Sequence, residues 1–424
     1  MIRQTGLRYS AAMNTWCEFF KLALCLCVMA NAMPAKGQEK IGEAKTFGQD
    51  VEFLKQHVDT IVLQSDSGNA QIAVVPAYQG RVMTSSAKGA DGTSFGWINY
   101  SYIEAGKITP HINVPGGEER FWLGPEGGQF SLFFAPGAKF EFDDWQTPPS
   151  IDTEPFEILD QSEQYATFGR SLKLQNYSGT EFDLKIERKV EVLSAAAAAE
   201  SIGENLGELA FVGYRTTNRL TNAGDEAWTR DGGLLSIWLL GMYKPSPATT
   251  VVIPLQSGPE GKLGPIVNDS YFGKVPTERL KIAGDVLFFS ADGIYRSKIG
   301  LSPQRSKDIC GSYDAQTNVL TIVKYNKPGA EVTDYVNSMW ELQDKPFAGD
   351  TVNAYNDGAT EPGAKPLGPF YELETSSPAF ALKPGESGVH VQETYHFNGP
   401  TADLNQLSEA LLGVSLSEIT AAFK

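Results

Sequence analysis

The segment from His111 to Gly128 reads HINVPGGEERFWLGPEGG and combines one His, three Glu, one Arg and one Trp with five Gly and two Pro. Glycines let a backbone approach a ligand closely, the polar side chains can converge on a small polar molecule, and Trp122 offers a flat apolar face. A sugar needs all three features. The alternative is a tight structural loop in which Arg120 pairs with a carboxylate and Trp122 fills the core.

A second group of candidate residues lies on a predicted strand, Tyr371–Thr375. Alternation along a strand places Glu372 and Glu374 on one face, roughly 7 Å apart. Two desolvated carboxylates at this spacing raise each other's pKa, which suits a general base or a cation ligand. On a solvated face they would be an ordinary pair of surface charges, and the pattern leaves both interpretations open.

Another carboxylate, Glu393, shares a predicted strand face with apolar residues such as Val391 and Tyr395, while His390 and His396 point to the opposite face. A lone carboxylate on an apolar face is either an ion-paired part of the structure or a site.

Composition limits the kinds of partner. The 35 basic and 51 acidic residues give a formal net charge of −16, which repels phosphate backbones, so we expect no nucleic-acid partner. With four His in the whole chain, any metal site would consist mainly of carboxylate and carbonyl oxygens and would be calcium-like; we expect no other cofactor.

The N-terminal residues have the pattern of an export signal. Lys21 precedes the apolar run Leu22–Ala30, which is too short to span a bilayer and is followed by the small residues Ala30-Asn31-Ala32. We expect cleavage near Gly37, and a soluble product in the periplasm or outside the cell without membrane insertion. A buried N-terminal helix is the alternative. After cleavage only Cys310 remains, so no internal disulfide is expected.

The dominant period along the chain is two. From Glu181 to Val192, charged residues alternate with apolar ones, which predicts a long antiparallel strand with one solvated face. Further strands are predicted by similar runs, which include Gln71–Pro76, Gln129–Phe134, Tyr165–Leu174, Leu209–Leu220, Leu234–Tyr243, Gly293–Leu301 and Gly388–Phe397.

Helix signals are few. Thr46 and Gln49 form a capping-box pattern, Ala195–Ala199 reads as a helical turn or a surface insertion, and Thr401–Leu412 reads as an amphipathic helix. We therefore predict an all-β protein, a large antiparallel β-sandwich with few peripheral helices. A signal peptide and leader would occupy residues 1–37, the β domain 38–400 and a C-terminal helix packed on it 401–424. Two sandwiches in tandem remain an alternative.

Several short motifs resemble the aldose 1-epimerase (galactose mutarotase) superfamily. Leu382-Lys383-Pro384-Gly385-Glu386 and the later Thr394-Tyr395-His396-Phe397 are similar to the end of these proteins, and Gly80-Arg81-Val82-Met83 is similar to an early strand. Leu373-Glu374-Thr375 stands where the superfamily has its catalytic glutamate. The Gly116-Gly117-x-x-Arg-x-Trp-x-Gly-Pro-Glu core resembles a motif of uncharacterised secreted bacterial relatives. The resemblance implies a galactose mutarotase-like supersandwich.

The sequence departs from mutarotases in its histidines. Leu220–Gly224 contains no His where the superfamily has Thr-Asn-His, and His111 does not directly precede the Gly-Gly pair. The resemblance therefore leaves the catalytic acid unassigned. The fold also hosts polysaccharide lyases, hydrolases and binding proteins.

These observations predict an exported carbohydrate-active protein, an epimerase, lyase or hydrolase, that takes a mono- or oligosaccharide in a cleft on a concave sheet. As an enzyme it would use Glu374 as general base and His111 as acid. Arg81, Arg120 and Glu126 would hold hydroxyl or carboxylate groups beside Glu372, and Trp122 would stack on a sugar ring. The alternative is a non-catalytic carbohydrate-binding protein that uses the same cleft. The oligomeric state stays open.

Overall fold

The alternating segment that begins at Glu181 forms one continuous strand, β7 (Glu181–Val192), in which every second residue from Phe182 onward is buried. Arg188 occupies one of these inward positions among the apolar residues. The computed structural model describes residues 45–360 and 363–424. The predicted signal peptide, its cleavage site and three of the four cysteines lie outside the described residues.

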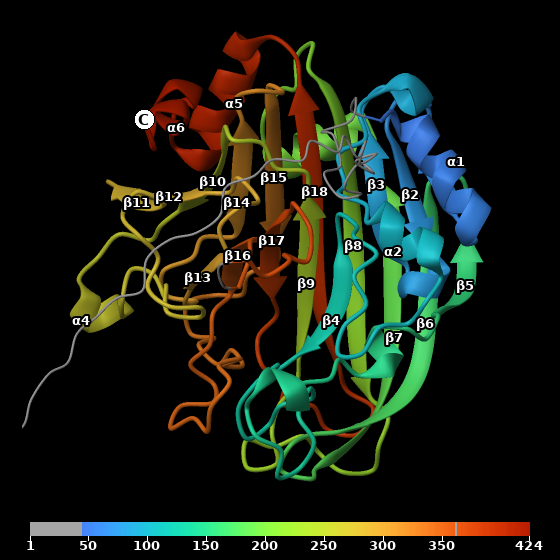
Figure 1. Ribbon diagram of the computed structural model, residues 1–424, viewed down its shortest axis with the longest axis vertical. Helices are drawn as coiled ribbons and strands as arrows, with labels where there is room; N and C mark the ends of the chain where they lie inside the picture. Colours follow the sequence, from blue (N-terminus) through green and yellow to red (C-terminus); the bar gives the residue numbers. More distant parts are fainter. Residues whose placement is uncertain (1–44, 361–362) are drawn as a thin grey trace, which may run out of the picture. The chain divides into compact units, whose positions relative to one another are not determined.

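Within the described residues the strands form three sheets, and every pairing between the named strands is antiparallel. The ten-stranded sheet has the order β11 (Leu280–Ala283), β12 (Val286–Ser290), β10 (Thr249–Pro254), β14 (Ile309–Asp314), β15 (Val319–Tyr325), β18 (Ser387–Asn398), β8 (Ala210–Asn222), β7, β6 (Tyr165–Gln175) and β5 (Glu157–Gln161). Figure 1 shows β18 between β15 and β8, near the middle of this sheet.

The five-stranded sheet has the order β13 (Ser297–Leu301), β16 (Val352–Asn356), β17 (Tyr371–Ser376), β9 (Ser236–Tyr243) and β4 (Arg120–Gly124). One face of it packs on the ten-stranded sheet: Leu373 of β17 and Ile299 of β13 share an apolar cluster with Val251 of β10 and Val323 of β15. This arrangement is a sandwich of two packed sheets, and it leaves the other face of the five-stranded sheet available for a site.

A three-stranded sheet of β1 (Ile61–Gln64), β2 (Gln71–Val75) and β3 (Arg81–Ser86) lies with α1 (Phe47–His57) and α2 (Tyr100–Ala105). The predicted capping box of α1 is present, because Thr46 and Gln49 each accept from the other's backbone N–H. Phe47 and Leu54 of α1 are buried against Ala73 and Val75 of β2.

Helices cover the outer face of the ten-stranded sheet. α3 (Ala195–Ile202), α5 (Thr401–Leu412) and α6 (Leu416–Ala421) share an apolar cluster with Tyr395 and Phe397 of β18. Because the opposite face of β18 carries the buried residues His390, Gln392 and His396, this strand is buried on both faces. The remaining helical elements are α4 (Glu260–Leu263) and the 3₁₀ turns η1 (Pro76–Tyr78), η2 (Gly89–Asp91), η3 (Phe142–Asp144) and η4 (Pro149–Ile151).

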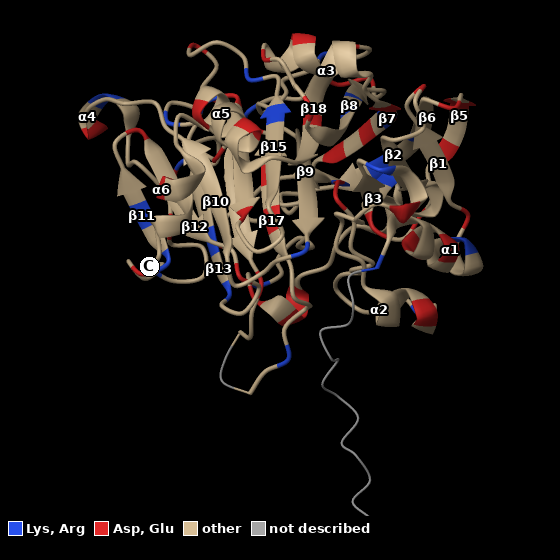
Figure 2. Cartoon of the chain, turned by 90° about the horizontal axis from the view of Figure 1, so that it is seen from above, with Lys and Arg blue, Asp and Glu red and all other residues tan. Residues whose placement is uncertain are grey.

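The predicted fold class, an all-β antiparallel sandwich with few peripheral helices, is confirmed. The strand predicted at Gln129–Phe134 is wrong: this segment pairs in no named strand, and Phe133 and Phe134 are buried through ring contacts with Trp122 and Trp340. Among the described residues, no helix is long and apolar enough to cross a membrane. Acidic and basic positions both occur across the sheets and loops (Figure 2).

Candidate functional site

Strand register gathers polar side chains on the free face of the five-stranded sheet. One row across the sheet runs from Asn353 of β16 through Glu374 of β17 and Leu240 of β9 to Arg120 of β4. The adjacent row places Lys298 of β13 beside Tyr355 and Glu372. Residues directly opposite each other in antiparallel strands point to the same face, so charged groups from three strands and the Asn353 amide of a fourth meet here.

A pocket of about 800 Å³ lies over this face; we call it the sheet pocket. Its aromatic lining comprises Phe142, Trp145, Trp238, Tyr271, Phe272, Trp340 and Tyr355, and its charged lining comprises Glu126, Arg296, Lys298, Glu341, Asp350, Asp357 and Lys365. A concave site with large apolar faces and a few convergent polar groups is the usual setting for a small organic ligand.

An ion pair lies at the floor of the sheet pocket. Lys298 Nζ is 2.9 Å from Glu374 Oε2, and Trp238 Nε1 donates to the same oxygen at 2.9 Å. The Glu374 side chain is fully buried and its Oε1 has no hydrogen-bond partner among the described residues, whereas Lys298 and Trp238 line the pocket. Glu374 is thus separated from the pocket by the two groups that hold it.

Glu126 follows the end of β4 and lines the pocket directly. Burial raises the pKa of Glu126 to about 7; the nearby Glu374 carboxylate adds to the rise, while Lys298 and a hydrogen bond from Trp340 oppose it. A carboxyl group with this pKa is partly protonated at neutral pH. It can therefore donate a proton to a bound molecule.

Glu372 lies below the same face. Its Oε1 is 3.4 Å from Arg120 Nη2, and both side chains are buried. Burial raises the pKa of Glu372 to about 7, against the lowering effect of Arg120 and with a further increase from Glu374. The carboxylates predicted from the Tyr371–Thr375 alternation are therefore desolvated rather than surface charges.

Two further carboxyls line the pocket with neutral partners. Asp350 Oδ2 accepts from Tyr271 Oη at 2.6 Å and from Asn268 Nδ2 at 3.1 Å. Asp357 accepts from Tyr355 Oη at 2.8 Å and from the Gly368 backbone N–H at 2.8 Å. Burial raises the pKa of both carboxyls above the ordinary value.

The structure brings together four of the predicted site residues, Arg120, Glu126, Glu372 and Glu374, although up to 254 positions separate them in the sequence. The cause is the sheet order, in which β9 lies between β4 and β17.

The other three predicted residues lie elsewhere. His111 sits near the rim, where its ring contacts Phe142 and its Nδ1 lies 2.7 Å from the Trp145 carbonyl oxygen; it makes no contact with Glu374. Arg81 is fully buried and donates to the Gly116 carbonyl at 3.0 Å. Neither residue lines the sheet pocket.

Trp122 is buried beneath the site instead of offering a free face. Its exposed fraction is 2%, the Arg120 guanidinium lies 3.8 Å from its ring centroid, and the rings of Phe133, Trp145 and Trp238 pack around it. We correct the expectation of a sugar stacked on Trp122: the rings that line the pocket are those of other aromatic residues.

Sequence reasoning missed Lys298, Asp350, Asp357 and the lining tryptophans. Lys298 lies within a strand that was predicted, and its alternation with Ile299 was visible, but a charge on a strand usually marks a solvated face. β16 was not predicted because it is short and two of its five residues, Asn353 and Asn356, are asparagines, a residue type depleted in strands.

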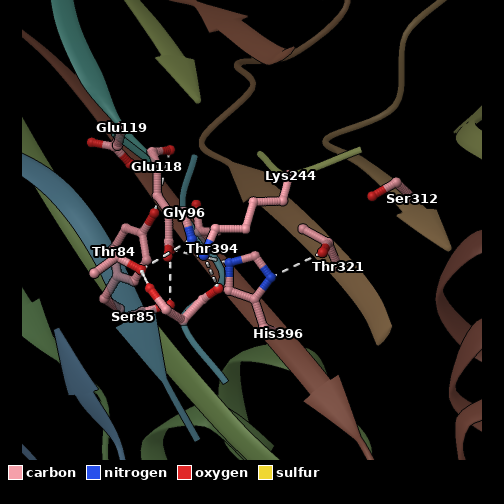
Figure 3. A network of polar contacts seen from close by, with 12 residues as sticks. Thr84, Ser85, Gly96, Glu118, Glu119, Lys244, Ser312, Thr321, Thr394 and His396 are labelled. Carbon is pink, nitrogen blue, oxygen red and sulfur yellow. Dashed lines mark hydrogen bonds and ion pairs between the residues drawn. The ribbon is translucent and has the colours of Figure 1, made fainter. Parts of the chain in front are cut away.

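A second polar cluster lies inside the sandwich (Figure 3). His396 Nε2 is 3.1 Å from Glu118 Oε2, Ser85 Oγ donates to the same oxygen at 2.9 Å, and His396 Nδ1 lies 2.9 Å from Thr321 Oγ1. All four side chains are buried, and Phe95 stacks on the imidazole. None of them lines the sheet pocket, so this cluster joins β3, β15 and β18 as part of the core.

Two inward-facing charges, Arg188 of β7 and the Glu393 that the sequence left open, have partners in the structure. Arg188 Nη2 is 2.9 Å from Glu119 Oε1, and both side chains are fully buried. Glu393 accepts from Arg215 at 2.6 Å, and Ser201 also donates to it. Both pairs are structural. Among residues 45–360 and 363–424, no group of three or more His, Cys, Asp or Glu is arranged to hold a metal ion.

Comparison with known proteins gives a family and a set of similar folds. A profile described as “Family of unknown function (DUF6786)” matches residues 45–423. No curated protein matches the chain.

Similar solved structures include the Slr1438 protein from Synechocystis sp., with 14% sequence identity over 81% of this chain and 96% of that chain and a TM-score of 0.47. A putative aldose 1-epimerase from Escherichia coli K12 has 13% identity over 80% of this chain and 98% of that chain, with a TM-score of 0.47. A galactose mutarotase-like protein from Lactobacillus casei has 11% identity over 80% of this chain and 100% of that chain, with a TM-score of 0.45. The superfamily suggested by the sequence motifs is thus represented among the structures that this chain resembles. These likenesses concern the path of the chain alone.

Proposed function

This chain belongs to the DUF6786 family of unknown function, and we propose that it binds a saccharide in the sheet pocket and acts on it by acid–base chemistry, with Glu126 as the proton donor. The observation that carries the proposal is the joint lining of one pocket by aromatic rings and by a carboxyl group whose pKa is about 7. Aromatic faces suit the apolar faces of sugar rings, and carboxyls accept hydrogen bonds from hydroxyls.

The chemistry follows from the position of the proton. In anomer exchange of a free sugar, a proton is delivered to the ring oxygen of the hemiacetal while the anomeric hydroxyl loses its proton to water. In cleavage of a glycosidic bond, the proton goes to the departing glycosidic oxygen and water adds to the anomeric carbon. Glu126 would supply that proton from the pocket wall. Glu374 would act through its negative charge, which favours the protonated form of Glu126, because it lies beneath the floor in contact with Lys298 and Trp238.

This assignment differs from the roles expected from the sequence. Glu374 was expected to be the base and His111 the acid, whereas in this proposal the acid is Glu126. We further propose, from the N-terminal signal pattern alone, that the protein is exported to the periplasm or the cell exterior.

The test combines binding with turnover. The wild-type protein is titrated with a panel of mono- and oligosaccharides by calorimetry, and each ligand is then followed by NMR for anomer exchange or bond cleavage. We expect Glu126→Gln to retain affinity within about tenfold and to lose roughly 10²–10⁴ in turnover. Glu331→Gln is the control, because Glu331 is exposed and does not line the sheet pocket, and this variant should turn over at the wild-type rate.

Three results would decide against parts of the proposal. Full turnover in Glu126→Gln would remove Glu126 as the donor. Binding without turnover in the wild type would favour the carbohydrate-binding alternative, in which replacement of Trp340 by Ala should weaken binding more than Glu126→Gln does. Failure of every saccharide to bind would exclude the pocket as a sugar site.

A further inference from the structure

The carboxyl group of Asp350 is arranged to receive a positively charged group from the pocket. Both of its hydrogen bonds, from Tyr271 and Asn268, end on Oδ2. Oδ1 accepts no hydrogen bond from a described residue and belongs to a side chain that lines the pocket. Neither donor carries a charge, and no described Lys or Arg lies within ion-pair distance of Asp350.

The cations near the pocket are already engaged or lie at its edge. Lys298 is held by Glu374 beneath the floor, and the Arg296 guanidinium lies 3.8 Å from the Phe272 ring centroid, where it acts on Asp357. Lys365 is exposed. The lining together with Glu374 contains five carboxyl groups; with Glu126 protonated at slightly acidic pH, four carboxyl groups remain against these three cations.

The aromatic lining favours the same sign of charge. The faces of Trp and Tyr rings carry partial negative charge and attract cations placed over them. The sheet pocket already shows this effect, because Lys298 Nζ lies 4.9 Å from the Trp238 ring centroid and 5.4 Å from that of Tyr271. Tyr271 is also the residue that donates to Asp350.

From these contacts we propose that the saccharide taken by the sheet pocket carries a protonated amino group, which binds Asp350 Oδ1 beside the Tyr271 ring. The inference rests on the proposed function, since it names the class of sugar that the same pocket takes. An ammonium group would supply Asp350 with the charged donor that the protein does not provide, and neutral sugars lack this group.

The test uses three pairs of sugars that differ only in the group at C2: glucose and glucosamine, galactose and galactosamine, mannose and mannosamine. Each is titrated by calorimetry at slightly acidic pH and matched ionic strength. We expect the amino sugar of at least one pair to bind about tenfold more tightly or better than its neutral counterpart. Added salt should reduce this ratio.

Asp350→Asn isolates the charge, because its side-chain oxygen can still accept from Tyr271 and Asn268. This variant should bring the ratio to within about threefold, because it weakens binding of the amino sugar more than binding of its neutral counterpart. Asp344→Asn is the control. Asp344 is exposed and lies six positions away in the sequence, outside the sheet pocket, so this substitution removes the same charge without changing the pocket.

The outcomes separate the two proposals. If the neutral sugars bind as tightly as the amino sugars in all three pairs, or if Asp350→Asn keeps the full ratio, the amino-sugar inference is wrong while the saccharide site stands. If no sugar of any kind binds, the proposed function is wrong as well.

Discussion

Replacing Lys298 by methionine should destabilise the protein by about 3 kcal/mol at pH 8. Lys298 is the cation that contacts the fully buried Glu374, and its charge also lowers the pKa of Glu126 and Glu372. Methionine keeps the length and packing of the chain but leaves Glu374 with the Trp238 indole as its remaining donor. The variant therefore removes the ammonium group that contacts the buried Glu374 carboxylate and lies near the carboxyl groups of Glu126 and Glu372.

The magnitude follows from burial. Removing one partner of a buried ion pair costs about 3–5 kcal/mol, and the lower figure applies because the Lys298 side chain is 11% exposed. An unfolding entropy of about 2.1 cal/mol/K per residue over roughly 380 residues converts 3 kcal/mol into a fall in Tm of about 4 °C. Glu126 and Glu372 are ionised mainly above pH 7, so the loss should be larger at pH 8 than at pH 5.5.

The measurement is thermal and urea unfolding followed by tryptophan fluorescence at both pH values. Adding Glu374→Gln to Lys298→Met should restore most of the lost stability, since the uncompensated buried charge is then gone. Lys365→Met is the control and should change stability by less than about 0.5 kcal/mol, because Lys365 lines the same pocket but is exposed. A loss below about 1 kcal/mol in Lys298→Met, or a double variant no more stable than the single one, would refute this account.

Three other outcomes are expected. Burial raises the pKa of Glu372 from its ordinary 4.5 to about 7, so the contribution of this residue to stability is fully present below pH 4.5 and is lost as pH rises through 7. In urea unfolding, Glu372→Gln should therefore reduce the loss of stability between these pH values by about 3 kcal/mol. A curve of stability against pH that runs parallel to the wild-type curve would contradict this. A Cβ added at Gly300 would overlap Asp350 Oδ2, so Gly300→Ala should lower Tm and weaken ligand binding together, whereas Gly261→Ala, where a Cβ meets nothing within 4 Å, should do neither. Burial also raises the pKa of the Cys310 thiol to about 12, so a thiol reagent should label it only after unfolding; rapid labelling of the native protein would show that this residue is accessible.

Local pattern was sufficient for most of the strands and helix ends. The alternation from Glu181 to Val192 matches β7 residue for residue, and the apolar stripe from Thr401 matches α5, because side-chain period reports directly which face is buried. The same logic failed at Gln129–Phe134, where phenylalanines are buried by ring packing of an irregular backbone that makes no ladder.

The order in which the strands pair could not be predicted from local sequence pattern, and this order decides which side chains meet at the site. Glu372 and Glu374 were placed on one face of a strand from the sequence, but whether that face is solvated depends on what lies over it. In the structure, β16 and β9 flank this strand and the loops that line the pocket cover the face.

The sequence by itself therefore determined the kinds of secondary-structure element and their main boundaries, because side-chain periodicity depends only on residues close together in the chain. It also identified Arg120, Glu126, Glu372 and Glu374 as candidate residues. Only the tertiary structure decided which groups these carboxyls meet. Lys298 and Trp238 hold Glu374, and Glu126 faces the pocket, because strands distant in the sequence are adjacent in one sheet. Burial and charge at a site are set by such neighbours, and they turn an ordinary glutamate into one whose pKa is about 7.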